Sequence, residues 1–88
     1  MKINSDFLFR TVSGKHLVIP TGTKAAEFNG MITLNDTGAF LWKQLETERT
    51  EDELVAAVVS NYPETGEDYA RTCVREFVEQ LRAADCLA

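Results

Sequence analysis

An apolar strand pattern passes without a spacer into an apolar helix pattern in Met31-Ile-Thr-Leu-Asn-Asp-Thr-Gly-Ala-Phe-Leu-Trp42. Leu34 ends the extended run, and the side chain of Asn35 is suited to accept a hydrogen bond from a free first-turn N–H. Asp36 adds negative charge where the helix dipole favours it, so we expect the helix to begin at residue 35 or 36. Strand and helix must then share one core.

One face of this predicted helix is apolar. Counting from Leu34, spacings of four, seven, eight and eleven residues give Gly38, Leu41, Trp42 and Leu45, one stripe of a 3.6-residue period. Trp42 is the largest of these side chains, and we expect it at the centre of the core. Glycine costs a helix about 1 kcal/mol relative to alanine, so Gly38 indicates either that another backbone passes close by or that the helix tolerates it.

Two strands are predicted before this stretch. Residues 7–13 are rich in aromatic and β-branched side chains, and residues 16–20 form a second such run that ends in proline. The turn Ser13-Gly14-Lys15 supplies a glycine for positive φ, so we expect an antiparallel hairpin. The pair Asn29-Gly30 either closes another hairpin, with a strand over residues 24–28, or bends the chain into residues 31–34.

Two more helices follow. Thr50-Glu-Asp-Glu53 has the form of a capping box and begins the second helix, which ends at Tyr62-Pro63. Thr65 opens the third and longest helix, of about 19 residues. Its core-facing stripe consists of Ala70, Val74, Phe77, Leu81 and Ala84. The predicted fold class is α+β, a three-stranded antiparallel sheet followed by three helices, in a winged helix-turn-helix-like arrangement.

Composition limits the function classes. With 88 residues and 44% apolar content, the chain is expected to form one domain over residues 1–88. The net charge of −5 repels phosphate backbones and anionic membranes, and no apolar run approaches the roughly 20 residues of a membrane span. We therefore expect a cytoplasmic protein with no nucleic acid and no membrane as partner.

The sequence carries no pattern typical of an enzyme or a cofactor site. The single histidine, His16, lies in an apolar strand, and neither Cys73 nor Cys86 lies at a helix N-terminus, where the pKa of its thiol would fall. These residues do not make a zinc pattern or a disulfide framework, and the glycines lack a phosphate-binding spacing. We expect no catalytic residue, no metal ligand, no cofactor, and two reduced cysteines.

Three arginines form a column on the third predicted helix. Arg71, Arg75 and Arg82 project within about 40° of one another beside the core stripe, with Val78 between them. They are either surface residues that pair with acidic neighbours one turn away or a charged rim beside an apolar groove. A rim of this kind suits a peptide that carries both acidic and hydrophobic residues.

The chain resembles the PqqD-like family in Leu34-Asn-Asp-Thr-Gly-Ala-Phe-Leu-Trp42, Thr50-Glu-Asp-Glu-Leu54 and Phe77-Val-Glu-Gln-Leu81. Members are recognition elements for ribosomally made, post-translationally modified peptides. The resemblance extends from about Phe7 to Leu87 and implies a three-strand meander, hence the bend at Asn29-Gly30. The family usually has Glu in place of Asp36, and Gly followed by a bulky residue in place of Asp85-Cys86-Leu87, which affects the end of the third helix.

The resemblance also implies a non-catalytic function. The family binds the leader of a precursor peptide as an added strand between the third strand and the third helix, and delivers it to a modifying enzyme such as a radical SAM protein. Carried over, the peptide-binding residues are Phe28, Asn29, Gly30, Met31, Ile32, Thr33, Arg71, Val74, Arg75, Val78 and Arg82. The same strand edge is open to weak pairing with a second copy of the chain.

Two other classes stay open. A winged-helix DNA-binding regulator would use the third helix for recognition, which the arginine column favours and the net charge of −5 disfavours. A structural subunit would pair through its sheet edge with itself or with another protein. Steep salt dependence of binding to duplex DNA would indicate the first, and a concentration-dependent mass the second.

Overall fold

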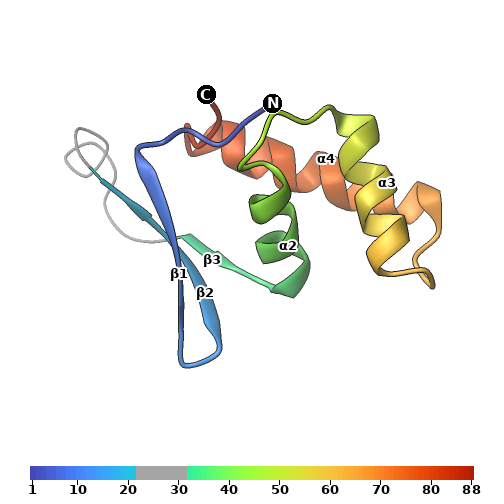
Figure 1. The fold of residues 1–88 in the computed structure, drawn as a ribbon, viewed down its shortest axis with the longest axis horizontal. Helices are drawn as coiled ribbons and strands as arrows, with labels where there is room; N and C mark the ends of the chain where they lie inside the picture. The colour runs from blue at the N-terminus through green and yellow to red at the C-terminus, as the bar shows by residue number, and fades with distance from the viewer. Residues whose placement is uncertain (22–31) are drawn as a thin grey trace.

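The computed structural model of the chain describes residues 1–21 and 32–88. Figure 1 shows three strands followed by three helices: β1 (Phe7–Val12), β2 (Lys15–Pro20), β3 (Ile32–Leu34), α2 (Asp36–Gln44), α3 (Glu51–Asn61) and α4 (Glu67–Ala83). The strands form one antiparallel sheet in the order β1-β2-β3. The predicted α+β fold class is therefore confirmed. The alternative strand over residues 24–28 lies outside the described residues.

The hairpin between β1 and β2 closes through a two-residue turn. Val12 pairs with Lys15, and the two residues between them have positive φ, 52° at Ser13 and 78° at Gly14. Positive φ at both central positions is typical of a type I′ turn, whose twist matches that of the flanking strands. The sequence predicted the glycine; Ser13 takes up the second left-handed position at a modest steric cost.

The register of the hairpin determines which way the backbone of β3 faces. A two-residue hairpin closes on a hydrogen-bonded pair, and such pairs alternate along an antiparallel ladder. His16 and Val18 therefore turn their N–H and C=O groups towards β3, where their partners are Leu34 and Ile32. Of the three residues of β3, Thr33 is the one that turns its backbone N–H and C=O away from the sheet.

Helix α2 begins as predicted. The side chain of Asn35 accepts a hydrogen bond from the Gly38 N–H at 2.7 Å, and Leu41 and Trp42 are 1% and 2% exposed. Of the two explanations left open for Gly38, the close approach of another backbone is not what the structure shows. A Cβ at Gly38 would lie 3.2 Å from Asn35 Oδ1 and 3.3 Å from Phe77 Cε1, so side chains, the cap and an aromatic ring of α4, occupy that space.

The next two helices differ in how they start. The Thr50 N–H donates to Glu53 Oε1 at 2.9 Å and the Glu53 N–H to Thr50 Oγ1 at 3.2 Å, which confirms the capping box of α3. In α4, Gly66 is the N-cap and the helix has 17 residues, so the predicted start at Thr65 is wrong. The reason is local: the Thr65 N–H donates to the Tyr62 C=O in the turn before α4.

Just after the end of α4 lies Asp85, one of the positions where the sequence departs from the family pattern. Asp85 has φ of 58°, the left-handed conformation that a glycine adopts most readily. The Cys86 N–H donates to the Leu81 C=O and the Asp85 N–H to the Arg82 C=O, the two bonds of a Schellman motif. Asp85 thus takes the place of the usual glycine, and the helix is capped in spite of it.

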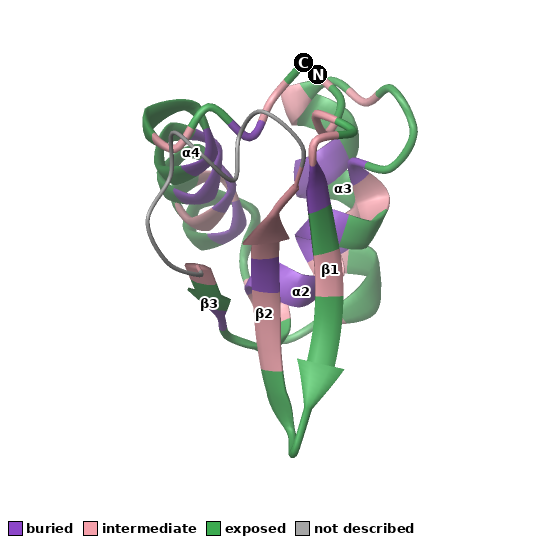
Figure 2. Cartoon of the chain, turned by 90° about the vertical axis from the view of Figure 1, so that its left-hand side faces the viewer, coloured by how far each residue is buried: buried purple, intermediate pink, exposed green. Residues whose placement is uncertain are grey.

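The core lies between the sheet and the helices, and Figure 2 shows buried residues on the sides of β2, α2 and α4 that face one another. It includes Phe7 and Val18 from the sheet, Trp42 and Leu45 from the α2 segment, and Leu81 from α4. The first and last residues of the chain lie together (Figure 1), where Ile3 bridges Leu87. Of the described helices, none has the length and apolarity needed to cross a membrane.

Candidate functional site

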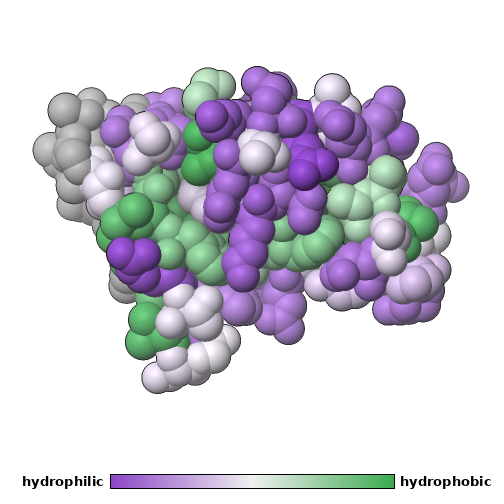
Figure 3. Space-filling view, viewed as in Figure 1, coloured by the Kyte–Doolittle hydropathy of each residue, from purple (hydrophilic) through white to green (hydrophobic). Residues whose placement is uncertain are grey.

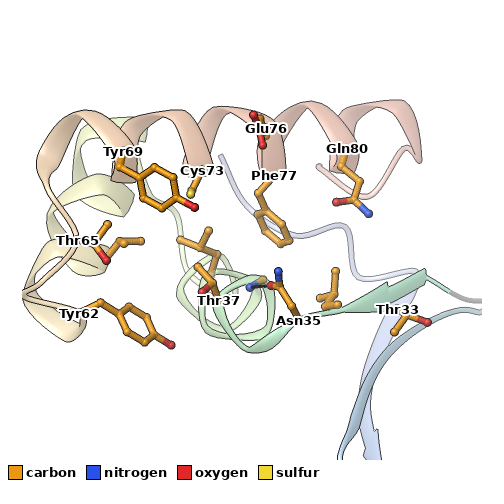
Figure 4. A pocket seen from close by; sticks show the side chains of 14 residues that line it. Thr33, Asn35, Thr37, Tyr62, Thr65, Tyr69, Cys73, Glu76, Phe77 and Gln80 are labelled. Atoms are coloured by element: carbon orange, nitrogen blue, oxygen red, sulfur yellow. Dashed lines mark hydrogen bonds between the residues drawn. The ribbon is translucent and has the colours of Figure 1, made fainter.

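A hollow of about 340 Å³ lies between β3, the first turn of α2, the end of α3 and one flank of α4. Figure 4 shows α4 along one side of it, with Asn35 and Thr37 facing that helix from α2 and its cap. Tyr62 and Thr65 close the end near α3, and Thr33 lies at the end near the sheet. The hollow therefore adjoins the one β3 residue whose backbone faces outward.

The wall formed by α4 consists of Tyr69, Cys73, Glu76, Phe77 and Gln80. Their spacing of three and four residues places them on one flank of the helix. Phe77 is 7% exposed and joins the hollow to the core, whereas Tyr69 is 67% exposed, an unusual position for a large aromatic side chain. This flank, named here the tyrosine flank, offers both apolar and polar contacts.

The lining is rich in neutral hydrogen-bonding groups. Threonine and tyrosine hydroxyls and the amides of Asn35 and Gln80 surround the hollow, and Glu76 is its one charged lining residue in the part of the chain that the structure describes. Hydroxyls and amides both donate and accept, so they suit the backbone of a peptide. The described lining includes one thiol, that of Cys73, and one carboxylate, that of Glu76, and no histidine.

No group of three or more His, Cys, Asp or Glu side chains suited to a metal ion occurs within residues 1–21 and 32–88. Both cysteines are free. Cys86 is fully buried, and desolvation raises the pKa of its thiol to about 11, with a smaller contribution from the charge of Asp85. A thiol of this kind is inert at neutral pH.

The strand half of the predicted peptide site divides into three parts. Phe28, Asn29, Gly30 and Met31 lie outside the described residues. Ile32 is half-buried and packs against the core. Thr33 is exposed and lines the hollow. Its N–H and C=O face away from β2, so β3 is an edge of the sheet that the described strands form. Pairing of this edge with a second copy stays a prediction.

The helix half of the predicted site lies elsewhere. Val74 and Val78 are 0% and 6% exposed and belong to the core. Arg71, Arg75 and Arg82 form the column predicted from the sequence, named here the arginine flank, and none of these five residues lines the hollow. At about 100° per residue, the arginines and the tyrosine flank project from opposite sides of α4. Whether the five residues contact a peptide stays a prediction.

The arginine flank is engaged within the protein. Arg71 Nη1 lies 2.9 Å from Glu51 Oε2 and 3.0 Å from Asp52 Oδ1, and Arg75 Nε lies 3.3 Å from the same Glu51 oxygen. These hydrogen bonds, with Asp52 before Glu51, raise the pKa of Arg71 above its ordinary value. The predicted pairing along α4, one turn away, is thus replaced by pairing between α4 and the first turn of α3.

Sequence reasoning missed the tyrosine flank. Tyr69, Cys73, Glu76 and Gln80 were not predicted to bind a ligand, and Phe77 was predicted to face the core. The same periodicity that reveals the core stripe of α4 defines a flank on each side of it, so the signal was present for both. The exposed aromatic Tyr69 was the one further hint in the sequence.

A second apolar area lies on the hairpin. In the view of Figure 3, hydrophobic surface appears over the hairpin end of the molecule, and Leu8 and Val12 of β1 are 41% and 55% exposed. Because β2 separates β1 from β3, this area and the hollow lie at opposite edges of the sheet.

Comparisons with known proteins place the fold. A model of the family described as coenzyme PQQ synthesis protein D (PqqD) matches residues 15–87. No curated protein sequence matches the chain. A solved structure described as TbiB1 in complex with the TbiA(beta) leader peptide is similar with a TM-score of 0.78 and 20% sequence identity, over 99% of this chain and 94% of that chain. At this identity the likeness concerns the fold.

Proposed function

The chain belongs to the PqqD family, and from this premise we propose that it binds the leader of a ribosomally made precursor peptide in the hollow and delivers it to a modifying enzyme. The observation that carries the proposal is the position of Thr33, which lines the hollow and directs its backbone away from the sheet. The structure of TbiB1, which is similar in fold, was solved with a leader peptide, and this supports the same class of ligand.

The peptide binds as a fourth strand beside β3. The N–H and C=O of Thr33 pair with its backbone, which gives affinity without regard to side chains. Alternate side chains of an added strand point to opposite faces, so every second one enters the hollow and meets Tyr69 and Phe77. These contacts supply the choice between peptides, while threonine hydroxyls satisfy polar groups that the peptide brings in.

The function is binding without catalysis: the described lining has no histidine, and no hydrogen bond joins its one thiol, Cys73, to its one carboxylate, Glu76. Chemistry is left to the partner enzyme, for which a radical SAM protein is one candidate. The domain raises the local concentration of the precursor at that enzyme, as any tethering module does.

The test uses the two cysteines as an internal pair. Cys73 lines the hollow, and Cys86 is buried with a raised pKa, about 11. The leader of the precursor encoded next to this gene, added in excess, is expected to slow alkylation of Cys73 by iodoacetamide, and a peptide of the same composition in scrambled order is expected not to. Binding of the leader without protection of Cys73, or no binding at all, would contradict the proposed site.

A further inference from the structure

The charges around the hollow disfavour an acidic ligand. Glu76 is the charged residue in its described lining, and the chain as a whole has a net charge of −5. The arginines of α4 project from the opposite side, where Glu51 and Asp52 engage two of them. Arg82 contacts Met1 Sδ at 3.8 Å. No described lysine or arginine therefore lines the hollow.

The carboxylate of Glu76 is available to a ligand. It takes part in none of the ion pairs found among the described residues, which use Glu48, Asp36, Glu51 and Asp52 as acids. Glu76 is exposed, and Figure 4 shows its side chain against the ribbon of α4, from which Phe77 and Gln80 extend toward the hollow. A cation placed here completes a pair, whereas an anion meets a like charge with no cation in the described lining to offset it.

We infer that the hollow selects a peptide segment with a lysine or arginine side chain facing Glu76 and no acidic residue at that position. The inference rests on the proposed function and gives the chemical class of its ligand. It replaces the acidic peptide that the arginine column suggested, because that column lies on the other side of α4. In an extended peptide, every second side chain points to the same face. If one side chain meets Glu76, the side chains two positions before and after it therefore meet the apolar parts of the hollow.

The size of the effect follows from the exposure of Glu76. Pairs between exposed charges are partly screened by water and salt, so loss of this pair is expected to weaken binding by about two- to five-fold. Most of the affinity comes from backbone pairing and apolar contact. The charge of Glu76 therefore acts on the choice of peptide more than on the strength of binding.

The experiment needs no knowledge of the natural ligand. A displayed library of random twelve-residue peptides is selected in parallel on the wild-type protein, on Glu76→Gln and on Glu79→Gln. Glu79 is exposed on the same helix and does not line the hollow, so its variant has the same net charge and serves as the matched control. Enriched peptides are resynthesised and tested for protection of Cys73 from iodoacetamide.

The expected result is enrichment of Lys or Arg at one position of the wild-type and Glu79→Gln pools, lost in the Glu76→Gln pool. For a resynthesised peptide, Lys→Glu at that position should weaken binding to the wild type, and Glu76→Lys should restore it. Enrichment of Asp or Glu, or enrichment of Lys or Arg that persists in Glu76→Gln, overturns the inference while protection of Cys73 upholds the proposed function. Enriched peptides that leave Cys73 unprotected contradict the proposed function itself.

Discussion

The two flanks of α4 both carry polar side chains, yet the structure gives them different roles. On the arginine flank, Arg71 and Arg75 meet Glu51 and Asp52 of α3, and charge is neutralised within the protein. On the tyrosine flank, Tyr69 and Glu76 border a hollow that the described residues leave open. The comparison shows that a row of like charges can be a packing device. A binding site is better sought where polar and apolar groups lack partners.

The core stripe between the flanks makes the comparison possible. Ala70, Val74 and Leu81 are 0% exposed and attach α4 to the rest of the protein. Both flanks border this stripe, so its packing sets the direction in which each flank projects. What differs is the neighbour: α3 lies against one flank, and β3 with the first turn of α2 lies across the hollow from the other.

A large-to-small substitution at the centre of the core should destabilise the whole fold, and with it the structure that positions both flanks. Trp42 is 2% exposed, and Trp42→Ala is expected to lower the free energy of unfolding by about 3–5 kcal/mol, the usual range for large-to-small changes at buried aromatic residues. Urea melts followed by circular dichroism measure it. Glu46→Ala, at an exposed residue just after α2, is the control and should change little. A loss of unfolding free energy below about 1 kcal/mol for Trp42→Ala would show that Trp42 is not at the centre of the core.

The two cysteines report separately on the hollow and on the core. At pH 8, iodoacetamide should modify Cys73 and leave Cys86 intact in the free protein. Because the pKa of Cys86 is raised to about 11, its thiolate fraction is about a hundredfold lower than that of an unperturbed thiol, and burial blocks the reagent as well. Peptide mapping by mass spectrometry distinguishes the sites. Equal rates of alkylation at Cys73 and Cys86 would show that the segment around Cys86, where Leu87 bridges Ile3, is open in solution.

Neighbouring residues of β3 should respond to proline in opposite ways. Thr33→Pro removes an N–H that faces away from the sheet, and proline is tolerated on an edge strand in that orientation, so the fold should persist. Loss of the backbone bond and the intrusion of the ring should weaken leader binding about tenfold or more. Ile32→Pro removes an N–H that faces Val18 of β2 and should lower the melting temperature instead.

Thr33→Val is the matched control, because it keeps the backbone N–H and removes the hydroxyl alone. Fluorescence anisotropy with the labelled leader gives the affinities, and circular dichroism confirms the fold of each variant. If Thr33→Pro binds as tightly as Thr33→Val, the added strand does not lie beside β3.

The sequence predicted the elements well because each rested on a local rule. The Asn35 cap, the Thr50 capping box and the glycine turn at Gly14 are decided by neighbours within four residues, and all three are confirmed. The core stripes of α2 and α4 followed from periodicity. The start of α4 was misjudged because the turn after Tyr62 uses the Thr65 N–H, a contact that no pattern in the sequence records.

The site was harder, since it depends on handedness. Periodicity identifies a core stripe with a flank on each side, but it does not state on which side β3 passes. The arginines attracted attention because charge is conspicuous in a sequence. Their partners, Glu51 and Asp52, lie about twenty residues earlier and were considered only as part of the capping-box segment that begins the second helix. The side of α4 that faces β3 becomes known only when the sheet and the helices are placed together.

The smallest expected effect is the one that separates the flanks most sharply. Replacing Arg71, Arg75 and Arg82 together by Gln should leave leader binding within about twofold of the wild type, because these side chains lie across α4 from the hollow. The charged-rim interpretation expects several-fold weaker binding and a flatter salt dependence. Anisotropy titrations at low and high salt distinguish the two outcomes.

Stability is the readout that should move in the same variant. Glu51 and Asp52 lose their guanidinium partners, so the free energy of unfolding should fall, and high salt should narrow the difference because these pairs are partly exposed. Glu51→Gln combined with Asp52→Asn removes the same ion pairs by changing the acidic partners. This double variant should also have a lower free energy of unfolding than the wild type, again without an effect on leader binding. If the arginine variant keeps its stability but loses the leader, the arginine flank binds the peptide, and the assignment of the hollow to the tyrosine flank fails.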